Sequence, residues 1–166
     1  MVDELCIEVD KNDNKIGLRP LNDFYTGKYI HRSSHILLFN SKEKVLMQKR
    51  AMDKKWYPGL YAYSVSGVVN KESYEECAKR EMEEEIGINT PVKLLFIYKY
   101  LDKFDKSFHA LFYAKSDKKI KLDNREMSSV KWISLTDLKK DLLRNPKKYV
   151  PHVRYGLKKF LKGGFR

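Results

Sequence analysis

Apolar and polar positions along the chain follow two different periods. Several segments alternate between apolar and polar residues, or form short apolar runs between turn residues, and both patterns are typical of β-strands. They predict strands over residues 5–10, 16–19, 31–39, 44–50, 61–65, 92–101, 107–114 and 126–133. A helical period predicts helices over residues 73–86, about 135–144 and 151–161. The sequence therefore predicts a mixed α/β fold.

The helix predicted over residues 73–86 carries acidic residues inside its apolar face. At 3.6 residues per turn, one stripe contains the apolar residues Tyr74, Cys77, Ala78, Met82 and Ile86. Glu81 and Glu85 fall within this stripe, and Glu84 flanks it. Burying a carboxylate costs free energy unless a metal ion or an arginine neutralises it, and Arg80 is adjacent. The pattern favours a metal-binding carboxylate cluster; a charged surface helix is the alternative.

Cap residues define where the helices begin and end. Ser73, followed three residues later by Glu76, forms a capping-box sequence at the start of the acidic helix. Gly87 is suited to end that helix in a left-handed conformation. Ser134 or Thr136 is expected to cap the next helix.

Length and composition fit one folded domain. The chain has 166 residues, of which 42% are hydrophobic and 13% aromatic, enough for a core. We expect a single domain over residues 1–166, with an N-terminal hairpin (about 1–30) and C-terminal helices (about 135–166) as additions. Cys6 and Cys77 lie in apolar patterns and are expected to be buried thiols. No apolar run approaches the ~18 residues of a membrane span. The first residues lack a signal-peptide layout, so a cytoplasmic location without membrane contact is expected.

The positive charge is concentrated near the C-terminus. The formal net charge is +12, and residues 135–166 contain ten Lys or Arg residues against two Asp residues. Basic surfaces attract anions, including nucleic acid and phosphorylated small molecules. A solvated basic helix is the favoured interpretation, and nucleic acid is the alternative partner.

The acidic helix resembles the signature of the Nudix hydrolases. Glu72, seven intervening residues and then residues 80–88 (REMEEEIGI) match the second part of that signature at every fixed position. The first part differs, because Ser66 occupies the expected glycine position. The nearest glycine, Gly67, leaves the loop to Glu72 one residue short. Residues 31–35, 45–50 and 54–59 are similar to the branch that contains the type I isopentenyl-diphosphate isomerases and their hydrolase relatives.

This resemblance implies a fold, a cofactor and a set of roles. The fold is a Nudix-type α/β/α sandwich around a mixed β-sheet, and the cofactor is Mg²⁺, with Mn²⁺ as an alternative. Glu81, Glu84 and Glu85 are implied as metal ligands and catalytic residues. One of them, or a glutamate from another loop, would deprotonate water. Arg80 is implied to act with them by orienting a glutamate, and Glu72 to support the site on its substrate-binding side.

Further residues match positions near the substrate. Arg50 and Lys54 correspond to positions that bind the diphosphate in relatives, although solvated basic residues are an equal alternative. Glu126 is a candidate metal ligand or base, but the favoured interpretation is that it is an ordinary residue at the start of a strand. Aromatic residues that could stack on a nucleobase, but more commonly pack in a core or loop, are Trp56, Tyr57, Tyr61 and Tyr63.

The isomerase pattern is not conserved at three positions. Ser66 occupies the position of the isomerase cysteine, and an unperturbed hydroxyl is a far weaker acid than a thiol, whose pKa is about 8.5. Val68 occupies a histidine position, and the other upstream metal histidine would fall near Phe24 or Tyr25. Only His31 remains.

The favoured function is Mg²⁺-dependent hydrolysis of a diphosphate linkage in a small molecule. The expected substrate is a nucleoside diphosphate derivative or a nucleoside triphosphate. An isopentenyl-diphosphate isomerase-like enzyme is one alternative. A non-catalytic nucleotide- or RNA-binding module is another, although such a module would not need the complete run of carboxylates. The sequence does not determine the oligomeric state.

Overall fold

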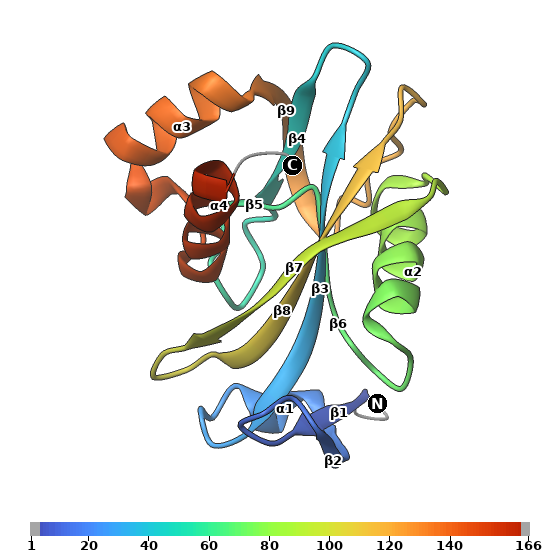
Figure 1. Cartoon of the computed structure of the whole chain (residues 1–166), viewed down its shortest axis with the longest axis vertical. Coiled ribbons are helices and arrows are strands. Elements are labelled where there is room, and N and C mark those ends of the chain that lie inside the picture. Colours follow the sequence, from blue (N-terminus) through green and yellow to red (C-terminus); the bar gives the residue numbers. More distant parts are fainter. Residues whose placement is uncertain (1–3, 164–166) are drawn as a thin grey trace.

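The computed structural model describes residues 4–163 and has one mixed sheet between two layers of helices (Figure 1). The strands are β1 (Leu5–Val9), β2 (Lys15–Pro20), β3 (Ile30–Phe39), β4 (Lys44–Arg50), β5 (Tyr61–Ala62), β6 (Val65–Val68), β7 (Val92–Leu101), β8 (Lys106–Lys115) and β9 (Met127–Ser134). The helices are α1 (Leu21–Phe24), α2 (Tyr74–Ile86), α3 (Leu135–Arg144), the 3₁₀ turn η1 (Pro146–Lys148) and α4 (Pro151–Gly163). The predicted α/β/α sandwich is confirmed.

Strand β3 organises the sheet. It pairs antiparallel with β1, β4 and β6 and parallel with β8. Its pairing with β4 is confined to the hairpin end, at Phe39 and Val45. Strand β4 continues the sheet away from β3 by pairing with β5 and β9. The sheet therefore divides beyond the β3–β4 hairpin.

Alternate residues of β3 build two separate cores, because successive side chains of a strand point to opposite faces. Leu37 and Phe39 pack with apolar residues of α3 and α4. Ile36 and Leu38 pack with Ala78, Met82 and other apolar residues of α2. Both faces of the strand are buried toward its end, which explains the apolar run of residues 36–39.

Most predicted elements are confirmed with small shifts at their ends, but residues 61–65 are not one strand. Strand β5 pairs with β4, and the chain then crosses to β6, which pairs with β3. Buried Ser64 holds this crossing: its Oγ donates to the Leu46 carbonyl (2.7 Å) and accepts from the Leu38 amide (2.8 Å). A side-chain hydroxyl thus replaces strand pairing where the two parts of the sheet separate. Helix α1 and η1 were not predicted.

The predicted helix ends are confirmed. Ser73 and Glu76 form both hydrogen bonds of the capping box, and Gly87 ends α2 with φ of 67°. Ser134, rather than Thr136, caps α3 by accepting from the Asp137 amide. The short α1 and the tight η1 are too brief to show a helical period in sequence.

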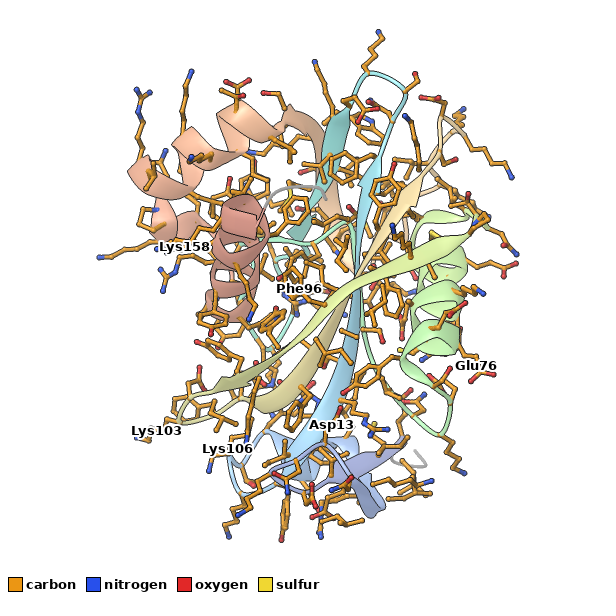
Figure 2. All side chains as sticks on the ribbon, in the orientation of Figure 1. Asp13, Glu76, Phe96, Lys103, Lys106 and Lys158 are labelled. Carbon is orange, nitrogen blue, oxygen red and sulfur yellow. The ribbon has the colours of Figure 1, made fainter. Side chains whose placement is uncertain are left out.

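Several surface and core expectations are also confirmed. Cys6 and Cys77 are buried free thiols. On α4, Lys158, Lys159 and Lys162 are exposed, and Figure 2 shows Lys158 on the outer side of that helix. No helix among residues 4–163 is long and apolar enough to cross a membrane.

Helix α4 contains a glycine that allows close packing. A Cβ at Gly156 would overlap the hydroxyl groups of Tyr63 and Tyr98, which are hydrogen-bonded to each other at 2.9 Å. We predict that Gly156→Ala lowers the free energy of unfolding by about 1–3 kcal/mol, since overpacking forces these rings apart. Denaturant unfolding measures the change.

The matched control is Gly163→Ala, in the last turn of the same helix, where an added Cβ meets nothing within 4 Å. Alanine favours the helix relative to glycine, so this variant should be neutral or slightly stabilised. Equal unfolding midpoints for the two variants would show that the close contact at Gly156 is not energetically important.

Candidate functional site

Helix α2 presents two of its carboxylates to the protein interior. Glu85 is only 4% exposed, and the Glu81 side chain is 16% exposed, whereas that of Glu84 is 59% exposed. A Cβ at Gly67 would overlap the Glu81 carboxylate, so only a glycine allows β6 to pass this close. The predicted arrangement of buried and flanking glutamates is present. Glu76 lies on the outer face of the helix, as Figure 2 shows.

Burial makes these two carboxylates hard to ionise without a cation. Desolvation raises the pKa of Glu81 to about 7 in spite of the charge of Arg80. Burial, followed by the negative charges of Glu81 and Glu126, raises the pKa of Glu85 well above its usual value. The Glu85 carboxylate accepts from Gln48 Nε2 at 3.3 Å and from the Ser66 amide. Clustered carboxylate oxygens in this state fit a hard divalent cation such as Mg²⁺ or Mn²⁺.

Arg80 forms ion pairs with three acidic residues. Its Nη1 contacts Glu81 Oε1 at 2.7 Å and Glu84 Oε2 at 3.2 Å, and its Nη2 donates to Glu72 Oε1 at 2.8 Å. Arg80 therefore orients Glu81, as the resemblance implied that it would orient a glutamate. Glu72 reaches Arg80 although its loop is one residue short, so the shortened loop preserves this ion pair.

A cavity of about 430 Å³ opens beside α2. Most of the residues predicted for the site line it, namely Arg50, Lys54, Arg80, Glu81, Glu84 and Glu85. Glu126 lines it too, and its Oε2 lies 2.6 Å from Lys54 Nζ. Arg50 Nε donates to the Trp56 carbonyl at 2.9 Å. Glu72 is not among the lining residues, since Arg80 holds its carboxylate, which supports a positioning role for Glu72 over direct substrate contact.

Only some of the candidate stacking residues reach this cavity. Trp56 and Tyr57 line it, together with Tyr25 and Phe104. Tyr63 does not line the cavity but is fully buried in the core, which confirms the favoured interpretation of core packing for this residue. Tyr61 packs against that core and against Lys131, and is likewise absent from the cavity lining.

All four histidines of the chain line the same cavity as the carboxylates. Of these, only His31 was singled out from sequence. His31, Ser33 and His35 occupy alternate positions of β3, and Ser107 and His109 alternate positions of β8. This period of two along each strand was a usable signal, but only the parallel register of β3 with β8 brings the two sets together.

A chain of hydrogen bonds runs through this cluster. Ser66 Oγ lies 3.0 Å from His35 Nδ1, and His35 Nε2 lies 2.8 Å from His109 Nδ1. His109 Nε2 lies 2.7 Å from Ser107 Oγ, which donates to Asp105 Oδ1 at 2.6 Å. Ser66 also donates its amide to Glu85, so this one residue connects the histidine cluster to the carboxylates.

All the hydrogen bonds of this chain donate in the same direction, from Ser66 toward Asp105. Burial would raise the pKa of Asp105, but contacts with His152 and His31 hold that pKa well below its usual range, so Asp105 only accepts. Burial lowers the pKa of His35 and of His109 well below their usual value, so both rings are neutral. Ser107 therefore accepts from His109 Nε2, and His109 Nδ1 accepts from His35 Nε2. His35 Nδ1 then accepts the Ser66 hydroxyl proton.

Comparison with known proteins identifies related sequences. The sequence model of the NUDIX domain matches residues 29–153. A prenyl-diphosphate phosphatase of Methanosarcina mazei is 40% identical over 161 residues, which cover 95% of each chain. Isopentenyl-diphosphate Delta-isomerase 2 of Photorhabdus laumondii is 32% identical over 144 residues, 83% of this chain and 81% of that protein.

Solved structures share the fold at lower identity. A crystal structure of a Deinococcus radiodurans protein superposes with a TM-score of 0.74 at 21% identity, covering 86% of this chain and 90% of the other. A MutT protein from Methanosarcina mazei gives a TM-score of 0.70 at 22% identity, covering 82% and 96%. At these identities the structures establish the fold alone.

The raised pKa of Glu81 predicts pH-dependent binding of Mg²⁺. A cation must displace the proton that Glu81 holds below about pH 7, so the affinity for Mg²⁺ should increase as the pH rises through that value. Calorimetric titrations at about pH 6 and about pH 8 should differ roughly tenfold or more for one displaced proton. Glu81→Gln should weaken this dependence and leave the part that comes from Glu85, and Glu83→Gln, on the exposed face, should keep all of it. Equal affinities at both pH values in the unmodified protein would contradict the assignment.

Proposed function

The chain belongs to the Nudix family and is a Nudix hydrolase, and we propose that its substrate is a prenyl diphosphate, whose diphosphate linkage it hydrolyses. Water would attack one phosphorus atom, the bridging P–O bond would break, and a prenyl monophosphate and inorganic phosphate would leave. This is narrower than diphosphate hydrolysis in general, and it departs from the nucleotide substrate expected from sequence.

The observation that carries the proposal is that the cavity is lined by both charged and aromatic side chains. The charged residues include Glu81, Glu85, Arg50 and Lys54. The aromatic part of the lining contains Tyr25, Trp56, Tyr57 and Phe104. A diphosphate attached to a hydrocarbon chain likewise combines a charged group with an apolar one. The name of the Methanosarcina mazei relative, a prenyl-diphosphate phosphatase, supports the same substrate class.

The aromatic part is built as a packed wall. The Trp56 ring stacks on Tyr25 with centroids 5.2 Å apart, and it lies 6.3 Å from the Phe104 ring. These rings come from the segment after β2, the loop after β4 and the loop between β7 and β8. Aromatic walls of this kind bind apolar groups through buried area.

The roles of the charged residues follow from their contacts. Nudix hydrolases generally need a divalent metal, and here Glu81 and Glu85 would hold it, with Glu84 at the rim of the cavity. The cation would supply charge neutralisation and Lewis acidity at the diphosphate. Arg80 fixes the Glu81 carboxylate, and Gln48 with the Ser66 amide fixes that of Glu85. Arg50 and Lys54 bring further positive charge to the diphosphate.

The isomerase alternative is disfavoured by the chemistry at Ser66. This hydroxyl donates to His35 and replaces the thiol that the isomerases use for proton transfer. The chain should therefore not exchange solvent deuterium into isopentenyl diphosphate. Incorporation above a control without enzyme would restore the isomerase hypothesis.

A substrate panel tests the proposal directly. Geranyl, farnesyl and geranylgeranyl diphosphate should be hydrolysed with Mg²⁺ to the monophosphate and phosphate, with a higher kcat/KM than nucleoside diphosphate derivatives or nucleoside triphosphates. Glu85→Gln should lower turnover by ~10²-fold or more, since charge stabilisation is lost. Glu83→Gln is the matched control and should retain activity. Preference for a nucleotide substrate would overturn the prenyl assignment while leaving the hydrolase assignment intact.

The aromatic wall can be tested separately from the carboxylates. Trp56→Ala should raise KM for farnesyl diphosphate about tenfold, because it removes roughly 1–2 kcal/mol of apolar contact. The effect on isopentenyl diphosphate, whose chain is shorter, should be smaller. Leu143→Ala, at an exposed apolar residue of α3, is the control. An equal change for both substrates would show that the hydrocarbon chain does not lie against Trp56.

A further inference from the structure

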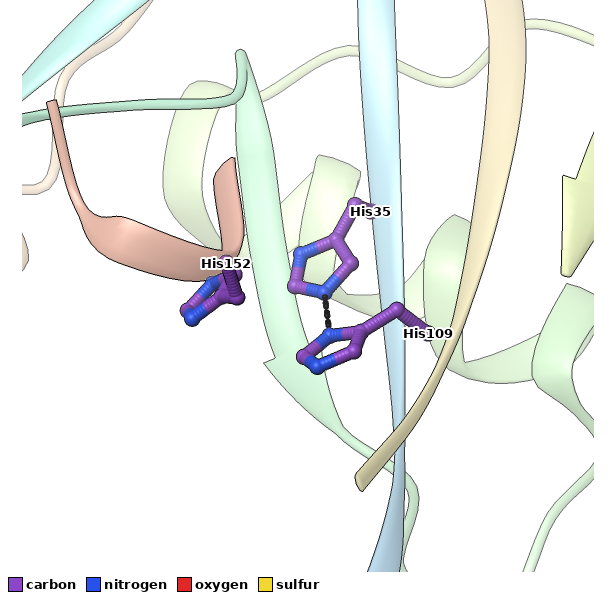
Figure 3. A group of neighbouring side chains, drawn as sticks. All are labelled: His35, His109 and His152. Atoms are coloured by element: carbon purple, nitrogen blue, oxygen red, sulfur yellow. Dashed lines mark hydrogen bonds between the residues drawn. The ribbon is translucent and has the colours of Figure 1, made fainter. Parts of the chain in front are cut away.

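Three histidines from separate elements lie together beside the cavity (Figure 3). His35 comes from β3, His109 from β8 and His152 from the first turn of α4. One ligand nitrogen from each lies within 4.8 Å of the other two. His35 and His109 are buried, and His152 is partly buried. Clustered imidazoles in a protected site are a common way to bind a transition metal.

We propose that His35, His109 and His152 bind a divalent transition-metal ion such as Zn²⁺, at a site separate from the carboxylates of α2. Zn²⁺ accepts three histidine ligands and leaves a fourth position open. Because all three histidines line the cavity, that fourth position would face the ligand space. The inference does not depend on the identity of the substrate.

The outer nitrogens have partners that could fix the rings as in metal-bound histidines, although His35 Nδ1 accepts from its partner when no metal is bound. Such histidines use the second ring nitrogen to bond a carboxylate, carbonyl or hydroxyl, which fixes the ring. His109 Nε2 is held by Ser107, which is held by Asp105. His35 Nδ1 is held by Ser66. The inner nitrogens, His35 Nε2 and His109 Nδ1, face each other at 2.8 Å, as Figure 3 shows.

Metal binding at the inner nitrogens needs no change in the number of protons. Without metal, the His35 proton lies on Nε2 and is shared with His109. With metal, the same proton would lie on His35 Nδ1 and be donated to Ser66 Oγ, whose own hydroxyl proton would turn toward the cavity. Both inner nitrogens then offer a lone pair, and both imidazoles remain neutral. Asp105 is ionised and accepts a hydrogen bond from Ser107, which in turn bonds His109. Asp105 therefore adds negative charge close to the site.

His152 is the ligand that would have to move. Its Nδ1 lies 3.2 Å from Asp105 Oδ2, at ion-pair distance, and its ring stacks on that of His109 with centroids 4.7 Å apart. In a tetrahedral site with Zn–N distances of about 2.0–2.1 Å, ligand nitrogens lie about 3.4 Å apart. A rotation of the His152 ring and a small separation of His35 from His109 would bring the three nitrogens to that spacing.

The site differs from both metal sites that the family resemblance suggests. The carboxylates of α2 offer oxygen ligands, which suit Mg²⁺. The metal histidines of the isomerases correspond to position 31, position 68 and the region of residues 24–25. None of the three histidines of this cluster falls at those positions.

Metal binding in the presence of Mg²⁺ tests the proposal. The metal-free full-length protein is titrated with Co²⁺ and with Zn²⁺ in millimolar Mg²⁺, which occupies the carboxylates and competes poorly for imidazole. We expect about one equivalent of Co²⁺ to bind with the visible absorption of a low-symmetry site, and Zn²⁺ to displace it. His152→Asn and His109→Asn should each weaken binding by about 100-fold or more. Zn²⁺ should raise the melting temperature of the unmodified protein but not of these variants.

Two matched variants separate this site from its neighbours. His31→Asn changes the one histidine outside the proposed ligand set, and it should keep the Co²⁺ spectrum. Glu85→Gln should keep it as well, because the carboxylates are not ligands of this site. Circular dichroism checks that each variant is folded. Because His152 is half-buried at the start of α4, His152→Asn is the variant least expected to disturb the fold. Absence of binding in Mg²⁺, retention by folded His152→Asn or loss in Glu85→Gln would overturn the proposal and leave the cluster as a hydrogen-bonded network only.

Discussion

The constraint on which the site depends is the burial of two carboxylates inside the apolar face of one helix. Glu81 and Glu85 share the stripe of α2 that packs against the sheet, so the helix cannot bury that stripe without desolvating them. Gly67 gives Glu81 the space it needs, and Arg80 pairs with the Glu81 carboxylate. A divalent cation bound by these carboxylates would offset the remaining cost. The fold and the proposed metal site therefore depend on the same two side chains.

The cavity brings together two kinds of candidate metal ligand. The oxygen donors come from α2, and the imidazoles come from β3, β8 and α4. Ser66 contacts both, through its amide to Glu85 and its hydroxyl to His35. A substrate that enters between them would meet a hard oxygen-ligand site and a softer nitrogen-ligand site. The aromatic wall around Trp56 would then receive the apolar part of that substrate.

Local sequence patterns predicted the acidic helix well because its determinants are close together in the chain. The capping box, Gly87 and the placement of Glu81 and Glu85 all lie within one helix and its caps. The histidine cluster was missed because it depends on the pairing of β3 with β8, more than 70 residues apart, and on the docking of α4. The break between β5 and β6 was missed for a similar reason. Ser64 bonds backbone groups of β3 and β4, and nothing near Ser64 in sequence shows those partners.

The central claim is that Glu85 stays protonated in the metal-free protein and ionises when a divalent cation binds. Infrared difference spectroscopy of the protein before and after addition of Mg²⁺ measures this directly, with Glu85→Gln to assign the signal. We predict that the C=O stretching band of a protonated carboxyl group is present without Mg²⁺, disappears when Mg²⁺ is added, and is absent from Glu85→Gln. A spectrum in which Glu85 is already ionised without metal, or remains protonated with Mg²⁺ bound, would contradict the account.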